Sequence, residues 1–152
     1  MEIVSAKYTQ PDKDAPNLDE RIEAKGAQLF SQGGDKLFLT LNLLNRRESV
    51  PRKVEDRKTS FAVAFGYQDT DEVSYTLPKG YKVEFVPEPV TINSEFGSYT
   101  ATATVKDNTL VYKRVQRMNS SKYPPEKYKD AVEFYKKIYL ADKVKAVLAK
   151  TE

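Results

Sequence analysis

The feature that most constrains the fold of this chain is a period of two in its apolar residues. Alternation of apolar and polar side chains puts one set on each face of an extended strand, so it is typical of strands with one buried face. The side chains involved are largely Leu, Val, Phe, Tyr and Thr, which favour strands. The pattern is clear in four segments: residues 37–43, 61–65, 73–77 and 99–105.

Residues 19–31 need a separate interpretation, because their alternation changes phase at Gly26. Ile22 and Ala24 lie in one phase, and Ala27 and Leu29 lie in the other. A β-bulge at the glycine would insert one residue and return both pairs to the same face. The alternative is a helix over residues 19–29. We favour the bulged strand, since a Gly33-Gly34 turn and a leucine-rich strand follow.

Turn-forming residues divide the chain into short segments. They occur at residues 32–35, 69–71, 78–80, 87–89 and 106–108. This spacing leaves about nine strands, and the Gly-Gly and Asp-Asn turns indicate hairpins with antiparallel pairing. We therefore predict a mainly β fold, an antiparallel β-sandwich.

The pattern changes near residue 119. Pro124-Pro125-Glu126 is typical of a helix start, and apolar side chains then recur at helical spacing up to Tyr139. We predict one C-terminal helix over residues 124–140, packed on the sandwich, and a short final strand at 144–148. The simplest division is one domain over residues 1–152, with a subdivision near residue 77 as the alternative.

Composition excludes several kinds of chemistry. The chain contains neither Cys nor His, so it has no Cys-His dyad, no Ser-His-Asp triad and no zinc site of the usual kinds. We expect no catalytic residue, no metal ligand and no cofactor. A net charge of +3 does not suggest a nucleic-acid partner, and no apolar run approaches the length of a membrane span.

Carboxylates are the remaining candidates for a site. Asp69, Asp71 and Glu72 could bind Ca²⁺ through oxygen ligands, but a turn held by Asp side chains explains them better. Glu88 and Glu95 could in principle act as a general acid and base, although no spacing defines such a pair.

A binding surface is suggested by two further features. The ten tyrosines offer apolar rings with polar tips, and residues 46–58 are rich in Arg and Lys with interleaved acidic residues. A solvated loop explains the basic stretch better than a binding face, and packing explains most tyrosines. The residues we would assign to a binding surface are Tyr81, Tyr99, Tyr112, Arg52 and Arg57.

Several short motifs together resemble a known family. They are residues 77–84 (LPKGYKVE), 96–99 (FGSY), 111–114 (VYKR), 123–128 (YPPEKY) and 142–144 (DKV). These motifs resemble the C-terminal β-domain of large bacterial transglutaminase-like envelope proteins. In that family, an N-terminal β-domain and a papain-like transglutaminase core precede the module.

The resemblance implies that the chain is a piece of a longer protein of the periplasm or cell envelope, whose catalytic Cys, His and Asp lie upstream. It also explains why residues 1–7 show no signal peptide. Our first hypothesis is a non-catalytic accessory module whose partner is the transglutaminase-like domain of the same parent chain. The alternatives are an independent glycan- or peptide-binding module and, less favoured, a small carboxylate-based hydrolase.

Overall fold

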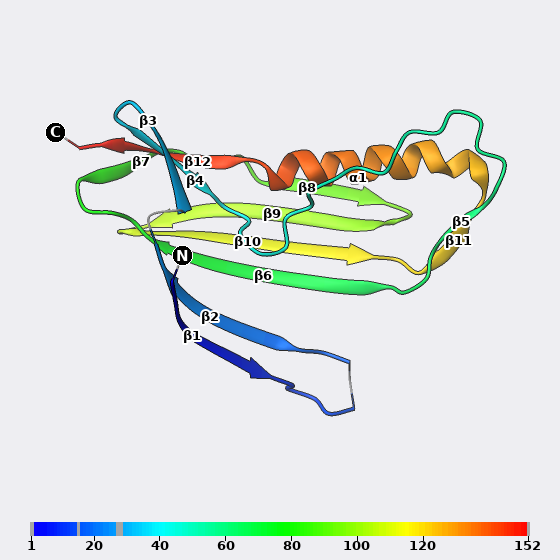
Figure 1. Ribbon diagram of the computed structural model, residues 1–152, viewed down its shortest axis with the longest axis horizontal. Coiled ribbons are helices and arrows are strands. Elements are labelled where there is room, and N and C mark those ends of the chain that lie inside the picture. Colours follow the sequence, from blue (N-terminus) through cyan, green and yellow to red (C-terminus); the bar gives the residue numbers. More distant parts are fainter. Residues whose placement is uncertain (1, 15, 27–28, 152) are drawn as a thin grey trace.

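The computed structural model describes residues 2–14, 16–26 and 29–151, and within them the chain is mainly β (Figure 1). The described residues contain twelve strands, more than the nine expected, in four antiparallel sheets. The larger sheet has the order β6 (Tyr67–Thr76), β10 (Thr109–Met118), β9 (Gly97–Lys106) and β8 (Val90–Ser94). Each of β6, β9 and β10 has ten residues, so this sheet is the longest unit of the fold.

A second four-stranded sheet covers part of one face of the larger sheet. Its order is β3 (Phe30–Gly33), β4 (Lys36–Thr40), β12 (Lys145–Lys150) and β7 (Tyr81–Phe85). β12 pairs with both β4 and β7, so the end of the chain joins two segments that are distant in sequence. The predicted final strand is therefore confirmed, and it lies in the interior of this sheet.

The C-terminal helix α1 (Tyr128–Asp142) completes the covering layer and leads into β12 (Figure 1). A short 3-10 helix, Pro125–Lys127, precedes it, so the prolines form a tighter first turn and α1 begins later than predicted. Ala131, Val132 and Ile138 of the predicted apolar stripe are buried, as is Phe134. The predicted C-terminal helix packed on a β-sandwich is confirmed.

One apolar core joins both sheets and the helix. The alternating residues of β9 and β10 point inward, and so does the leucine pattern of β4. Because the buried cluster takes side chains from both sides of residue 77, the two halves of the sequence share one core. The core includes Leu39, Tyr75, Tyr99, Leu110, Phe134, Ile138 and Leu148.

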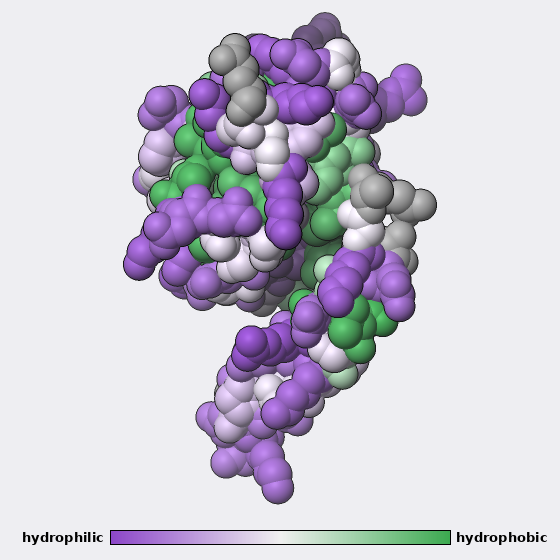
Figure 2. Space-filling model, turned by 90° about the vertical axis from the view of Figure 1, so that its left-hand side faces the viewer, coloured by the Kyte–Doolittle hydropathy of each residue, from purple (hydrophilic) through white to green (hydrophobic). Residues whose placement is uncertain are grey.

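The segment 19–31 is split between two sheets. β2 (Asp19–Lys25) pairs with β1 (Glu2–Thr9), whereas β3 pairs with β4. Gly26 lies outside both strands, so the prediction of one strand carried through a bulge at Gly26 is wrong; residues 27 and 28 lie outside the described residues. The strand interpretation of residues 19–25 is confirmed, and β1 and β2 form a hairpin that projects as a separate arm (Figure 2).

Two further expectations are corrected. Residues 69–71 do not form a turn, because β6 pairs with β10 without interruption from Tyr67 to Thr76. Phe65 does not share the buried face of Phe61 and Val63, because β5 (Phe61–Val63) ends two residues before it. β5 pairs with β11 (Ser121–Tyr123) in a small sheet of its own. Among the described helices, none is long and apolar enough to cross a membrane.

Candidate functional site: a buried polar cluster

The most unusual feature of the core is a charged side chain in the inward phase of β10. Leu110, Tyr112, Arg114, Gln116 and Met118 all point to the interior of the fold. The side chain of Arg114 is 2% exposed, although arginine is almost never fully buried unless it is paired. Its surroundings therefore have to supply negative charge.

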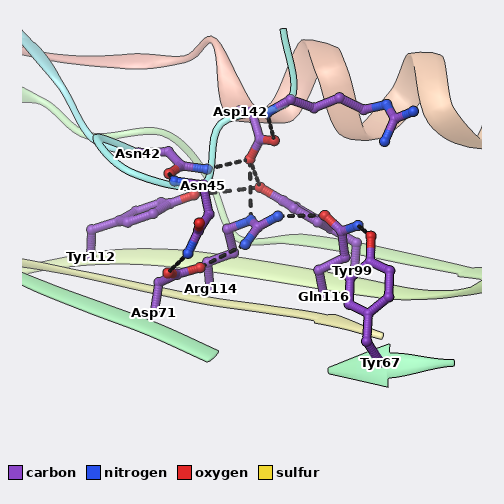
Figure 3. Close-up of polar contacts among 10 residues, drawn as sticks. Asn42, Asn45, Tyr67, Asp71, Tyr99, Tyr112, Arg114, Gln116 and Asp142 are labelled. Atoms are coloured by element: carbon purple, nitrogen blue, oxygen red, sulfur yellow. Dashed lines mark hydrogen bonds and ion pairs between the residues drawn. The ribbon is translucent and has the colours of Figure 1, made fainter. Parts of the chain in front are cut away.

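Two carboxylates and one amide surround the Arg114 guanidinium (Figure 3). One terminal nitrogen lies 2.6 Å from Oδ2 of Asp71, and the other donates to Oε1 of Gln116. Nε lies 3.4 Å from Oδ1 of Asp142, an ion pair without good hydrogen-bond geometry. Charge-assisted contacts of this kind offset much of the cost of removing a cation from water.

Asp142 is the second centre of the cluster. It is the last residue of α1, and its side chain is fully buried. The helix C-terminus carries partial negative charge, so this position is unfavourable for a carboxylate unless other groups compensate. Three donors do so: Asn42 Nδ2 at 2.8 Å, the Tyr99 hydroxyl at 2.9 Å and the Arg47 backbone N–H at 2.8 Å.

Outer contacts extend the cluster to the neighbouring strands. The Asn45 side-chain amide donates to Asp71 at 2.5 Å, and the Gln116 amide donates to the Tyr67 hydroxyl at 3.1 Å. The hydroxyls of Tyr99 and Tyr112 lie 3.4 Å apart. The cluster thus connects the sheet, the end of α1 and the loop that begins after β4.

The protonation of these groups follows from burial and pairing. Burial is the main reason that the pKa of Tyr99 lies far above its usual value, and the hydrogen bond with Tyr112 and the charge of Asp142 add to it. For Arg114, burial opposes the charge, but the hydrogen bond to Asp71 and the nearby carboxylates outweigh it and raise the pKa. The cluster therefore holds neutral tyrosines and a permanently charged arginine.

This arrangement holds elements together and offers little to a substrate. Each carboxylate accepts from several donors of the protein itself; Asp142 is fully buried, and the Asp71 side chain is only 13% exposed. The long loop between β4 and β5 is fixed along α1 by further contacts. The Arg47 guanidinium lies 4.0 Å from the centre of the Tyr135 ring, and the Tyr128 hydroxyl donates to the Arg52 carbonyl at 2.9 Å.

The five residues predicted to form a binding surface do not share one. Tyr99 and Tyr112 are buried, because their strand phases point inward, so assigning them to a surface was wrong. Tyr81 begins β7, whereas Arg57 packs over the ring of Tyr128 at 4.5 Å. β7 and the start of α1 lie at opposite ends of the molecule (Figure 1), and Arg52 is exposed on the loop beside α1.

The predicted carboxylate sites are also dispersed. Asp71 pairs with Arg114, whereas Glu72 points the other way and lies 3.0 Å from Lys113. Glu95 lies 2.8 Å from Lys127. In the part of the chain that the structure describes, no group of three or more acidic side chains is placed to hold a metal ion.

Sequence reasoning missed Arg114, Asp142 and Asn42 as a cluster. A signal for Arg114 exists, because a charged residue occupies the apolar phase of a strand that is otherwise buried on that face. Asn42 lies between Leu41 and Leu43, in the phase that the alternation predicts to face outward, where a polar residue is expected and gives no such signal. Asp142 is the last residue of α1, and only the tertiary structure brings it next to Arg114 and Asn42.

The fold and the cluster define a class of protein. It is a mainly β module, covered on one side by a helix, in which buried polar side chains bind one another. Among its described residues, no acidic side chains form an exposed metal site. Residues 35–148 match the family DUF3858, described as a domain of unknown function. Because the match covers most of the sequence, this chain belongs to that family. Comparisons with curated proteins and with solved structures gave no match.

Proposed function

We propose that this chain is a non-catalytic accessory module that packs on a transglutaminase-like catalytic domain of the same parent chain, in the periplasm or cell envelope. The motif resemblance motivates the identity of the partner. The observation that carries the proposal is the β1–β2 hairpin, which lies outside the family match and has an open apolar face.

Cross-strand pairing makes this hairpin amphipathic. Ile3 lies opposite Ala24, and Ala6 lies opposite Ile22, so these four side chains share one face. Charged residues are concentrated on the other face, where Glu2 lies opposite Lys25 and Lys7 lies opposite Arg21.

The apolar face has no cover comparable to that of the larger sheet. Ile3 and Tyr8 are each 59% exposed, and every residue of β1 is exposed, whereas Ile22 and Ala24 of β2 are half-buried. A two-stranded hairpin is at best marginally stable in water without a packing partner. A partner domain that covers this face would supply the burial that the module itself does not.

The test uses the full-length parent protein. Replacing Ile3 and Ile22 together by Glu should lower the melting temperature and the turnover of the catalytic domain, because two apolar contacts worth roughly 1.5–3 kcal/mol each are lost. Arg21→Glu, on the opposite face of the same hairpin, is the matched control and should leave both quantities unchanged.

The isolated module should give the same circular dichroism spectrum with Ile3→Glu/Ile22→Glu as without it. If the double variant and Arg21→Glu behave alike in the parent, and deletion of the module changes neither melting nor turnover, the proposal is wrong.

A further inference from the structure

The outer edge of the larger sheet is formed by β6, and it differs from the other edges of the two four-stranded sheets. β6 runs for ten residues and contains no Pro, Gly, Lys or Arg. Long edge strands without such residues pair readily with a strand of another chain, so proteins usually protect them. The other three outer strands are protected. β3 has only four residues, β7 carries Lys82, and β8 follows Pro87 and Pro89 and contacts α1.

The direction of the β6 backbone groups follows from the turn that joins β9 to β10. Lys106 lies opposite Thr109 across a two-residue turn, and residues that flank such a turn form a hydrogen-bonded pair. Backbone groups alternate in direction along a strand, so the next residue, Leu110, bonds to β6, whose odd-numbered residues lie opposite. The odd-numbered residues of β6 therefore face β10. The bond from the Leu77 N–H to the Asn108 carbonyl, at 3.0 Å, continues the same alternation.

The even-numbered residues of β6 consequently present their backbone groups to the open edge. The N–H and C=O groups of Gln68, Thr70, Glu72 and Ser74 point away from β10, and within the described parts of the chain no other strand pairs with β6. The β1–β2 hairpin forms a sheet of its own and diverges from β6 (Figure 1). The edge thus offers the free donors and acceptors that strand addition needs.

The inward side chains of β6 determine which strand fits this edge. Asp71 has its cation in the core, whereas the half-buried Asp69 lies opposite the uncharged Gln116 and takes part in no ion pair among the described residues. An added strand with Arg or Lys opposite Asp69 would supply the missing cation. Apolar side chains beside Tyr67, which is 45% exposed, and beside the half-buried Val73 would extend the core.

We propose that the β6 edge binds an extended basic segment of another protein by antiparallel strand addition. Antiparallel pairing continues the arrangement of this sheet and is slightly more stable per residue than parallel pairing. The densest basic run of this chain, residues 46–58, is held along α1, where Arg47 lies over Tyr135 and Arg57 lies over Tyr128. The strand therefore comes from a different polypeptide.

A second copy of β6 fits this edge poorly. Because only even-numbered residues have free backbone groups, they would have to lie opposite one another. The two such registers with the longest antiparallel overlap place Asp71 opposite Asp71 or Glu72 opposite Glu72. Like charges directly opposite one another are destabilising, so the acidic edge disfavours its own copy and favours a basic strand.

Fluorescence anisotropy with labelled heptapeptides tests the proposal. In the antiparallel register, VKTTRTY places its Arg opposite Asp69 and its apolar ends beside Val73 and Tyr67. It should bind at least about tenfold more tightly than VKTTETY, in which Glu replaces that Arg. Asp69→Asn should remove most of this preference. Glu84→Gln, which removes a carboxylate from the edge strand β7, is the matched control and should leave the preference unchanged.

Thr70→Pro tests the backbone part of the proposal. The Thr70 N–H faces the open edge, so Pro removes a donor to the peptide and no bond to β10, and Pro is tolerated at such positions. VKTTRTY should no longer bind, while the circular dichroism spectrum stays that of the unmodified chain. Thr70→Val keeps the N–H and should bind normally.

Modified peptides give the same test without any change in the protein. Methylation of VKTTRTY at the backbone nitrogens of its second, fourth and sixth residues, which face β6, should abolish binding. Methylation at the third and fifth residues should not. The proposal is overturned by absence of binding, by equal affinity for the Arg and Glu peptides, or by equal effects of the two methylation patterns. A dimer of the peptide-free chain that Thr70→Pro dissociates would identify a second copy as the occupant and would overturn it as well.

Discussion

Arg114 is the residue on which most of the buried polar contacts depend. It is the cation for both Asp71 and Asp142, and these carboxylates in turn hold Asn42, Asn45 and the backbone of Arg47. Removing one partner of a buried ion pair is costly, because it leaves the other charge without compensation. The neighbouring pair Lys113–Glu72 contains the same charges but is more than half exposed.

Arg114→Met should therefore lower the free energy of unfolding by about 3–5 kcal/mol, because it leaves the buried Asp142 and the partly buried Asp71 without their cation. Lys113→Met is the matched control one residue away, and its effect should be less than about 1 kcal/mol, as is usual for exposed pairs. Urea denaturation followed by circular dichroism measures both. Equal effects of the two variants would show that the cluster contributes no more than a surface pair.

At the scale of elements, the start of β9 depends on one glycine. Gly97 has φ +152° and lies opposite Met118, where β10 ends. A Cβ at this position would lie 2.0 Å from the carbonyl oxygen of Arg117, a distance that requires the strands to separate. Gly34, in the β3–β4 turn, also has a positive φ, +64°, but a Cβ on this residue would meet no atom within 4 Å.

Gly97→Ala should consequently lower stability by more than about 2 kcal/mol, since a steric clash with backbone adds to the conformational cost. Gly34→Ala should lower it by about 1–2 kcal/mol, the cost of a left-handed conformation alone. Thermal unfolding compares the two variants. A smaller effect at Gly97 than at Gly34 would contradict the close approach of β9 and β10.

At the scale of the whole molecule, the buried tyrosines link folding to alkaline pH. Burial raises the pKa values of Tyr75, Tyr99 and Tyr112 above the ordinary value of 10.0. In the unfolded chain these hydroxyls lose their protons near pH 10, whereas in the folded protein they keep them. The unfolded state therefore binds fewer protons above that pH, and stability must fall as pH rises.

We expect absorbance at 295 nm to report two populations of tyrosine. Tyr75, Tyr99 and Tyr112, whose pKa values burial raises, should ionise only together with loss of the circular dichroism signal. In urea all ten tyrosines should titrate in one step near pH 10. Ionisation of every tyrosine near pH 10 in the folded protein would contradict the enclosed position of these hydroxyls.

Local patterns were sufficient for several elements of this fold. The period of two in residues 37–43, 73–77 and 99–105 depends only on which side of a strand each side chain takes, so it predicts strands with one buried face. The prolines at 124 and 125 and the helical spacing after them likewise predict α1. The motif resemblance pointed to a domain of unknown function, and residues 35–148 match such a domain, DUF3858.

Pairing between distant segments was beyond such patterns. Residues 69–71 were predicted to form a turn because Asp and Thr are common in turns, but the ladder with β10 and the contact of Asp71 with Arg114 keep them extended. The backbone around Phe65 is set by two pairings between residues more than fifty positions apart in sequence, Tyr67 with Met118 and Val63 with Ser121.

The sequence by itself determined several of the strands, the helix and the absence of thiol and imidazole chemistry, because these depend on local alternation and composition. Only the tertiary structure decided which polar residues meet. Asn42, Arg114 and Asp142 come from a loop, a strand and a helix end, and they form one cluster since the fold removes all three from water together. Burial in the same core also keeps Tyr99 and Tyr112 away from the surface, to which their polar hydroxyls had led us to assign them.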